Sequence, residues 1–434
     1  MKERREVAAR LQALQTCYDL DTIIDVTTLT GGEWKTLLRI DTAAASYVAS
    51  ISHPTTPVES LAYEHRLLRY LHARLPQVPA PLVAQDGSTY FVEQGRIVCL
   101  LPLMPGVMAE GDQIHLAAAR FLAQFQRVGM GYPDPAPRPG VPAWHTWDWH
   151  AATWPTMEAM LLAAANETTN SALGQRLWRA CGEWTPQIVA RRAQIIEERA
   201  YFQQWIHDLA HSGRSLTMGL LHDDYHGNNL LAAGETITAL LDWDSCHPDW
   251  LVWDLSNALW EFCHDDDTHA LVVKDTQAFL ATYAAAGGPV PVQEYDLIIP
   301  LIRCRRMIEV LGSLQGIATG GAWDESPDYL VHNLLALEKL RSVTIEFDLN
   351  RILVILPITD PRKVEDLALQ LTLRYLGDAA QVQAEADDAP FNQGGWKVGV
   401  YRTDGELPVG YLFFSSEGEF LPEFSTRFDR MRAA

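Results

Sequence analysis

One short polar region in the middle of the chain carries residue types that could do chemistry together. It reads HDDYHGNN over residues 222–229, and the acidic segment LLDWD follows at residues 240–244 after a turn at Gly234. Within it, Asp224 stands five positions before Asn229. Phosphoryl transfer from a nucleotide needs a carboxylate that orients the acceptor hydroxyl and accepts its proton, and oxygen ligands that hold magnesium against the phosphates. The two segments contain both kinds of group.

We therefore assign Asp224 as the catalytic base, and Asn229 and Asp242 as ligands of Mg²⁺. His222 is expected to support the loop by hydrogen bonding. The alternative is a polar loop in which Asp and Asn side chains only satisfy the backbone of a turn. The hairpin that leads to Asp242 and the Asp254-Leu255 pair downstream favour the catalytic interpretation.

Two strings carry a family resemblance, HDDYHGNNLL at residues 222–231 and LLDWDSCHPDWLVWDL at residues 240–255. They resemble the aminoglycoside phosphotransferase and choline kinase superfamily, which includes a homoserine-kinase-like branch. The resemblance extends over about residues 20–340 and implies a protein-kinase-like fold with the roles given above. It also implies that Asp254 braces the catalytic loop rather than touching substrate. Asp223 departs from the family, which commonly has Gly at this position.

The upstream part of the chain matches the family at fewer positions. Thr30-Gly31-Gly32-Glu33 stands where these enzymes have the turn that covers the nucleotide phosphates, although a simple hairpin turn is an equal alternative. Glu64 matches the helix Glu that normally holds a strand Lys or Arg. The resemblance places this basic residue at Ser50, so the phosphates lose a charge-assisted partner there. Lys35 or Arg39, both close to the glycine turn in sequence, could supply the charge instead.

Two other interpretations stay open. The first is a weakened kinase, or a silent nucleotide-binding or interaction protein with the kinase fold, and Ser50 favours it. The presence of both Asn229 and Asp242 opposes it, because a silent site has no need of both metal ligands. The second is a protein kinase, which is disfavoured because Asp254 follows Asp242 within twelve positions and leaves no room for a peptide-docking loop.

The elements expected around these residues form a β-rich part followed by a helix-rich part. Apolar and β-branched runs within residues 21–58 predict strands, and a helical period predicts a helix over residues 61–75. The apolar run at residues 97–104 is expected to form the hinge that takes the adenine or guanine ring, with Leu101 and Leu103 as contacts. From residue 112 onward helices dominate.

We predict an α+β, protein-kinase-like two-lobed fold with a small C-terminal α+β appendage. The predicted domains are a nucleotide-binding lobe at residues 1–104, a helical lobe with the catalytic and metal loops at 105–342, and the appendage, of unknown role, at 343–434. Within the helical lobe one helix is expected over residues 186–211. Within the appendage, a loose segment rich in Ala, Asp and Gln is expected between a helix and a hairpin.

Composition and charge narrow the range of partners. The formal net charge is −21 with no basic patch, so neither nucleic acid nor an anionic membrane is an expected partner. An acidic surface suits a cationic substrate, although solubility alone would also explain it. No window is apolar enough for a transmembrane span. The six cysteines are scattered without a C-x-x-C pair, so we expect neither a disulfide scaffold nor a cysteine-based zinc site, and a cytoplasmic location.

The sequence thus predicts a kinase that requires Mg²⁺ and ATP, or GTP, and phosphorylates a hydroxyl of a small, amine-bearing acceptor. Glu261 and residues 265–267 lie where related enzymes often place acidic substrate contacts, with a solvated loop as the alternative. The tryptophans at positions 144, 147, 149 and 154 could form a wall for a cationic group or pack an irregular connection. The acceptor, the nucleotide and the oligomeric state stay open.

Overall fold

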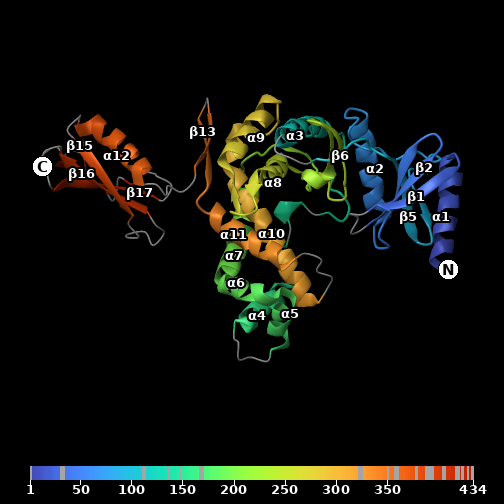
Figure 1. Cartoon of the computed structure of the whole chain (residues 1–434), viewed down its shortest axis with the longest axis horizontal. Helices are drawn as coiled ribbons and strands as arrows, with labels where there is room; N and C mark the ends of the chain where they lie inside the picture. Colours follow the sequence, from blue (N-terminus) through green and yellow to red (C-terminus); the bar gives the residue numbers. More distant parts are fainter. Residues whose placement is uncertain are drawn as a thin grey trace. The chain divides into compact units, whose positions relative to one another are not determined.

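The computed structural model consists of two compact units, Met1–Ala336 and Leu337–Ala434 (Figure 1). The residues that it describes are 2–29, 35–109, 114–134, 136–141, 143–146, 148–165, 171–320, 326–348, 351–355, 361–376, 380–386, 395–402, 407–415, 421, 425–427 and 430–431. Among these residues, no helix has the length and apolar character needed to cross a membrane.

The N-terminal part of the first unit is an antiparallel sheet of five strands in the order β1-β2-β3-β5-β4. Its elements are α1 (Lys2–Tyr18), β1 (Ile23–Leu29), β2 (Thr36–Thr42), β3 (Ser46–Ile51), α2 (Val58–His72), β4 (Phe91–Glu93) and β5 (Arg96–Pro102). Alternate residues of β2, Leu38 and Ile40, lie in a buried cluster with Leu14 of α1. Burying each of these side chains contributes about 1.5–3 kcal/mol, so the cluster holds α1 against the sheet.

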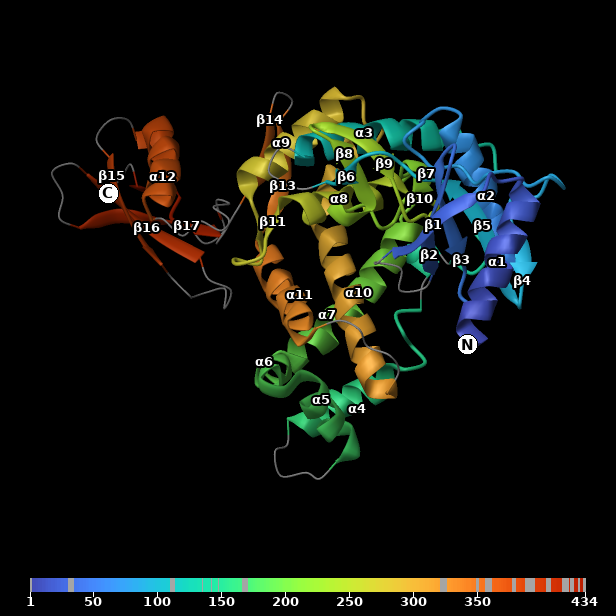
Figure 2. The same ribbon diagram turned by 45° about the vertical axis from the view of Figure 1, so that its right-hand side comes forward.

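Helices form most of the remainder of the first unit, and α3, α8, α9 and α10 pack together there (Figure 2). The helices are α3 (Ile114–Met130), α4 (Trp154–Ala164), α5 (Ala172–Cys181), α6 (Thr185–Ala190), α7 (Arg192–His211), α8 (Leu251–Cys263), α9 (Val273–Ala285), α10 (Ile298–Thr319) and α11 (Pro327–Leu340), with short 3-10 turns η1 (Trp144–Thr146), η2 (Gly182–Trp184), η3 (Gly227–Asn229) and η4 (Val292–Leu297). Helix α10 buries residues along its whole length, among them Leu301, Met307 and Leu314, as is typical of a core helix.

Short strands of the first unit position the two polar loops. These strands are β6 (Val107–Met108), β7 (Met218–Leu221), β8 (Leu230–Ala233), β9 (Thr236–Leu240), β10 (His247–Trp250), β11 (His264–Asp265) and β12 (Ala270–Leu271). Loop 222–229 follows β7, which pairs with β10, and loop 241–246 follows β9, which pairs with β8. The backbone N–H of Leu241 donates to the Asn229 carbonyl at 2.8 Å, so the two loops lie side by side.

The second unit contains a hairpin and a small α+β layer. Its elements are β13 (Thr344–Asp348), β14 (Arg351–Ile355), α12 (Pro361–Leu376), β15 (Ala380–Ala386), β16 (Gly395–Arg402) and β17 (Pro408–Ser415). Helix α12 begins at Pro361, whose fixed φ suits the first helical position. Val364 and Ala368 of this helix share a buried cluster with Val398 of the β15-β16-β17 sheet.

Two local predictions are wrong. Residues 186–211 do not form a single helix, because α6 ends at Ala190 and α7 begins at Arg192. Neither Gly nor Pro marks this break, so the hydrophobic period continues through it. Ala380–Ala386, expected to be loose, is strand β15. Its Ala, Gln and Glu residues have low strand propensity, and pairing along β16 overrides that local preference.

Candidate active site

Loop 222–229 brings its acidic and amide side chains together. The Asn229 side-chain amide donates to Asp224 Oδ2 and to the Asp224 carbonyl, both at 2.9 Å. His226 Nε2 lies 3.4 Å from Asp224 Oδ2 and 3.0 Å from Asn229 Nδ2. Burial acts to raise the pKa of Asp224, but the hydrogen bond and charge of His226 outweigh it and lower the pKa to about 2. Asp224 is therefore an ionised hydrogen-bond acceptor at neutral pH.

The same loop is fixed from behind by Asp254, at the start of α8. The backbone N–H groups of His222 and Asp223 donate to the two Asp254 oxygens at 3.1 and 2.9 Å. His222 Nε2–H donates to the Leu241 carbonyl at 2.9 Å. Burial lowers the pKa of His222 to about 4, so the ring is neutral and keeps this single donor at physiological pH. These bonds tie loop 222–229 both to α8 and to loop 241–246.

Asp223 occupies the position where the superfamily commonly has Gly, and its backbone explains that preference. Its φ is +65°, a left-handed conformation that Gly adopts freely and that Asp tolerates better than most residues. The Asp223 carboxylate accepts hydrogen bonds from the indole N–H groups of Trp144 and Trp253, both at 2.9 Å. The two indoles stack at 4.7 Å, and Arg305 lies 3.7 Å from the carboxylate. Trp144 thus packs behind the loop.

Replacing Asp223 tests whether this carboxylate holds the loop. In Asp223→Gly the φ remains permitted, but two indole N–H groups lose their acceptor, so we expect a loss of about 2–3 kcal/mol in the free energy of unfolding. Asp223→Asn tolerates the same φ and keeps an oxygen acceptor, so it should lose less than half as much. Urea denaturation followed by tryptophan fluorescence measures both. Equal losses in the two variants would rule out a stabilising role for the indole hydrogen bonds.

Loop 241–246 carries excess negative charge. Burial raises the pKa of Asp242, and the neighbouring charge of Asp244 adds to the rise. Asp242 also has φ +56°, so the backbone turns sharply at this residue. Asp244 is paired with Lys35, whose ammonium lies 3.7 Å from Glu64 Oε1.

Lys35, rather than Arg39, brings positive charge to these carboxylates. It directly precedes β2, whose first residue pairs with the last residue of β3. Burial acts to lower the pKa of Lys35, but the carboxylates of Glu64 and Asp244 outweigh burial and raise it. Ser50 on β3 is buried, and Arg39 pairs with Asp41 at 3.0 Å away from this group. The cation that Ser50 lacks is therefore supplied from the end of the adjacent strand.

Sequence reasoning missed a second cation, Arg138. Its side chain is only 4% exposed and donates to Glu64 Oε2 at 2.7 Å. It also donates to the carbonyls of Trp243 and Cys246, at 2.7 and 3.2 Å. Arg138 thereby joins α2 to loop 241–246. The one available signal was a lone Arg in the proline-rich stretch APRPGVP, where an isolated charge needs a partner if it is buried.

The remaining predicted site residues are less closely connected to this group. Leu101 and Leu103 are half-buried at the end of β5, where Leu101 pairs with Val48 and the Leu103 N–H donates to the Ser46 carbonyl. Gly31 and Gly32 lie outside the described residues.

Of the predicted acceptor contacts, Glu261 has a specific partner. It lies 3.4 Å from the guanidinium of Arg306. The Asp265 carboxylate accepts bonds from the backbone and hydroxyl of Thr268, so it stabilises its own turn. Trp149 is buried and Trp154 lies under Arg199, and both therefore pack the connection.

A two-lobed fold that sets an ionised Asp against an Asn, beside a carboxylate-rich loop, defines a kinase-like phosphotransferase. Residues 25–297 match the APH model, the phosphotransferase enzyme family, and the chain belongs to this family. The homoserine kinase of Azorhizobium caulinodans is 22% identical over 302 residues, which cover 68% of this chain and 82% of that protein.

Solved structures of low sequence identity share the fold. The amicoumacin kinase hAmiN, described in complex with AMP-PNP and Ca²⁺, has a TM-score of 0.52 at 15% identity and covers 77% of this chain and 95% of its own. A microcompartment-associated aminopropanol kinase has a TM-score of 0.52 at 16% identity and covers 77% and 96%. The predicted superfamily, α+β kinase-like fold and enzyme class, a phosphotransferase with a hydroxyl acceptor, are thus confirmed.

Proposed function

We propose that this chain transfers the γ-phosphate of ATP to a hydroxyl of a small, amine-bearing acceptor. The observation that carries the proposal is the pairing of Asp224 with Asn229 at 2.9 Å, in a loop hydrogen-bonded to the loop of Asp242. Relatives and structural neighbours named homoserine kinase and aminopropanol kinase support an acceptor with both a hydroxyl and an amine.

The donor set of the two loops fits a divalent cation. The negative charges of Asp244 and Asp224 both raise the pKa of Asp242 beyond the effect of its burial, so negative charge there exceeds what Lys35 neutralises. Asn229 and Asp242 would hold Mg²⁺, which prefers oxygen ligands and keeps several waters. Bound there, the ion would neutralise charge on the phosphates.

Asp224 would orient the acceptor. As an ionised carboxylate it accepts a hydrogen bond from the acceptor hydroxyl, and it takes the proton as the hydroxyl oxygen bonds to the γ-phosphorus. The bond from the phosphorus to the bridging oxygen of the nucleoside diphosphate breaks in the same displacement. Because the pKa of Asp224 is about 2, orientation is its main contribution and the proton moves late. His222 positions the loop through its bond to the Leu241 carbonyl.

The nucleotide would lie against the N-terminal sheet. Lys35 would donate to phosphate oxygens, with Glu64 holding it from 3.7 Å away. Leu101 and Leu103, half-buried beyond the end of β3, would contact the base. The turn at Gly31-Gly32 would cover the phosphates with backbone N–H groups. We place ATP before GTP as the donor.

The acceptor side of the loop has a negative field that suits an amine. Burial acts to lower the pKa of His226, but Asp224 raises it, and Glu261 and Asp242 add to the rise. A cationic amine beside these carboxylates would gain the same attraction. We also propose a cytoplasmic location, where the free cysteines would remain reduced.

Calorimetry with ATP, in magnesium and in excess chelator, tests the metal and nucleotide sites. We expect a dissociation constant in the micromolar range, about −8 kcal/mol, that requires Mg²⁺ and weakens at least tenfold in Asp242→Asn. Asp41→Asn, an exposed substitution on β2, is the control and should bind as the native protein does. Binding of equal strength with and without magnesium would refute the assignment of Asp242 as a metal ligand.

A further inference from the structure

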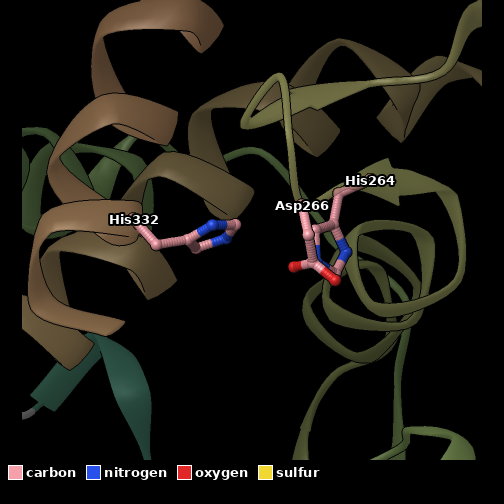
Figure 3. A group of neighbouring side chains, drawn as sticks. All are labelled: His264, Asp266 and His332. Carbon is pink, nitrogen blue, oxygen red and sulfur yellow. The ribbon is translucent and has the colours of Figure 1, made fainter. Parts of the chain in front are cut away.

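A cluster of two histidines and one aspartate lies at the far end of α8 from loop 222–229. His264 and Asp266 belong to the β11–β12 hairpin and its turn, and His332 belongs to α11 (Figure 3). One ligand atom from each side chain lies within 4.8 Å of the others. Figure 3 shows the ring of His332 pointing toward the other two side chains. Helix α8 separates this cluster from Asp254 by ten residues, roughly 15 Å of helix.

The position of His264 is fixed by two contacts. Its Nδ1–H donates to the Trp260 carbonyl at 2.7 Å, and its ring stacks on the Trp260 indole at 4.8 Å. This tautomer leaves the Nε2 lone pair 3.1 Å from Asp266 Oδ1. A lone pair and a carboxylate oxygen repel each other at that distance unless a proton or a metal ion lies between them. Backbone-bonded imidazoles of this kind are typical metal ligands.

His332 is also prepared to act as a ligand. Burial, together with nearby His264 and His269, lowers the pKa of His332 to about 4, so the ring is neutral at physiological pH. Metal binding requires the neutral imidazole. His332 Nδ1 lies 2.8 Å from His269 Nδ1, and a proton donated by His332 there leaves its Nε2 free for a metal.

We propose that His264, Asp266 and His332 bind one Zn²⁺ ion, with the fourth position open to water. Two nitrogens and one carboxylate oxygen form a common three-residue zinc set, whose neighbouring ligand atoms lie roughly 3.4 Å apart in a tetrahedral arrangement. The His264–Asp266 separation of 3.1 Å already matches. The Asp266 side chain is 88% exposed, so it can rotate onto the ion without disturbing the core.

The proposed ion would join the β11–β12 hairpin to α11. Helix α11 runs from Pro327 to Leu340 and continues into the second compact unit. The site is separate from the proposed magnesium site in both place and chemistry, because magnesium prefers oxygen ligands whereas zinc favours imidazole. The zinc proposal does not depend on the proposed kinase reaction.

Zinc titration of the full chain in excess Mg²⁺ tests the proposal. After removal of metals by a chelator, calorimetry and elemental analysis should give one Zn²⁺ per chain at the strongest site. Asp266→Asn, an exposed change, should weaken zinc binding at least about tenfold, and His332→Gln by about a hundredfold or more. Magnesium-dependent ATP binding by Asp266→Asn should match that of the native chain, which separates failure here from failure of the kinase proposal.

A competing zinc site on α7 provides the control. His207 and His211 are exposed, one helical turn apart, with their rings stacked at 4.2 Å. Zinc affinity in His211→Gln should equal that of the native chain. If His211→Gln abolishes binding while Asp266→Asn and His332→Gln do not, the ion sits on α7 and the proposal is wrong. Failure of the native chain to bind zinc at micromolar concentration would leave a proton-bridged His264–Asp266 pair and also overturn the proposal.

Discussion

Asp224→Asn is expected to lower the rate of phosphoryl transfer by about 10²- to 10⁴-fold. Asparagine has the same shape and keeps an oxygen that can accept the 2.9 Å bond from Asn229, so the loop should retain its conformation. What it loses is the negative charge that aligns the acceptor hydroxyl and receives its proton. Steady-state release of ADP in the presence of an acceptor measures the effect.

Binding measurements separate this loss from a damaged fold. Asp224 is not a proposed metal ligand, so Asp224→Asn should bind ATP and magnesium within about threefold of the native chain. Asp41→Asn is the surface control for turnover. A variant Asp224→Asn that keeps more than a tenth of the native rate would show that another group positions the acceptor.

Lys35→Ala is expected to weaken ATP binding by about 10- to 150-fold, which corresponds to about 1.5–3 kcal/mol for hydrogen bonds to a charged group. Lys35 is the cation that contacts both Glu64 and Asp244, and no basic residue stands at Ser50. Arg39→Ala, which removes an equal charge at the other end of β2, should change the affinity less than twofold. Calorimetry on the two variants gives the comparison.

A restored cation would sharpen this test. Ser50 pairs with Leu37 on β2, close to Lys35 in the sheet. Ser50→Lys in the Lys35→Ala background should therefore recover part of the lost affinity, because it returns positive charge to the position that the superfamily uses. Unchanged ATP affinity in Lys35→Ala would remove Lys35 from the nucleotide site altogether.

The polar loops could be predicted because their residues are close in sequence. Asp224 and Asn229 are five positions apart and contact each other directly, and a hairpin leads from them to Asp242. The choice between Lys35 and Arg39 was not accessible in the same way. Both lie on one strand, and only the position of Glu64 relative to its two ends decides between them, over a length of about 13 Å.

Contacts between distant parts of the chain were the main omission. Arg138 bonds to Glu64 across 74 positions, and His332 contacts His269 across 63. Neither pair has a local motif, so only the packed fold brings them together. Asp223 shows the opposite case, because the departure from Gly was visible in the sequence but its meaning depended on a backbone angle and two distant indoles.

Acceptor-dependent phosphate transfer by the native chain tests the central claim most directly. The chain would be incubated with magnesium and ATP, alone and with homoserine, aminopropanol, ethanolamine or spectinomycin, and the products followed by ADP release and phosphorus NMR. We predict that at least one acceptor stimulates ADP release at least tenfold and yields a new phosphate monoester, and that Asp224→Asn does neither. Binding of magnesium and ATP without stimulation by any of these acceptors would contradict a kinase for small amine-bearing alcohols, and would favour a nucleotide-binding protein that has kept the fold without the reaction.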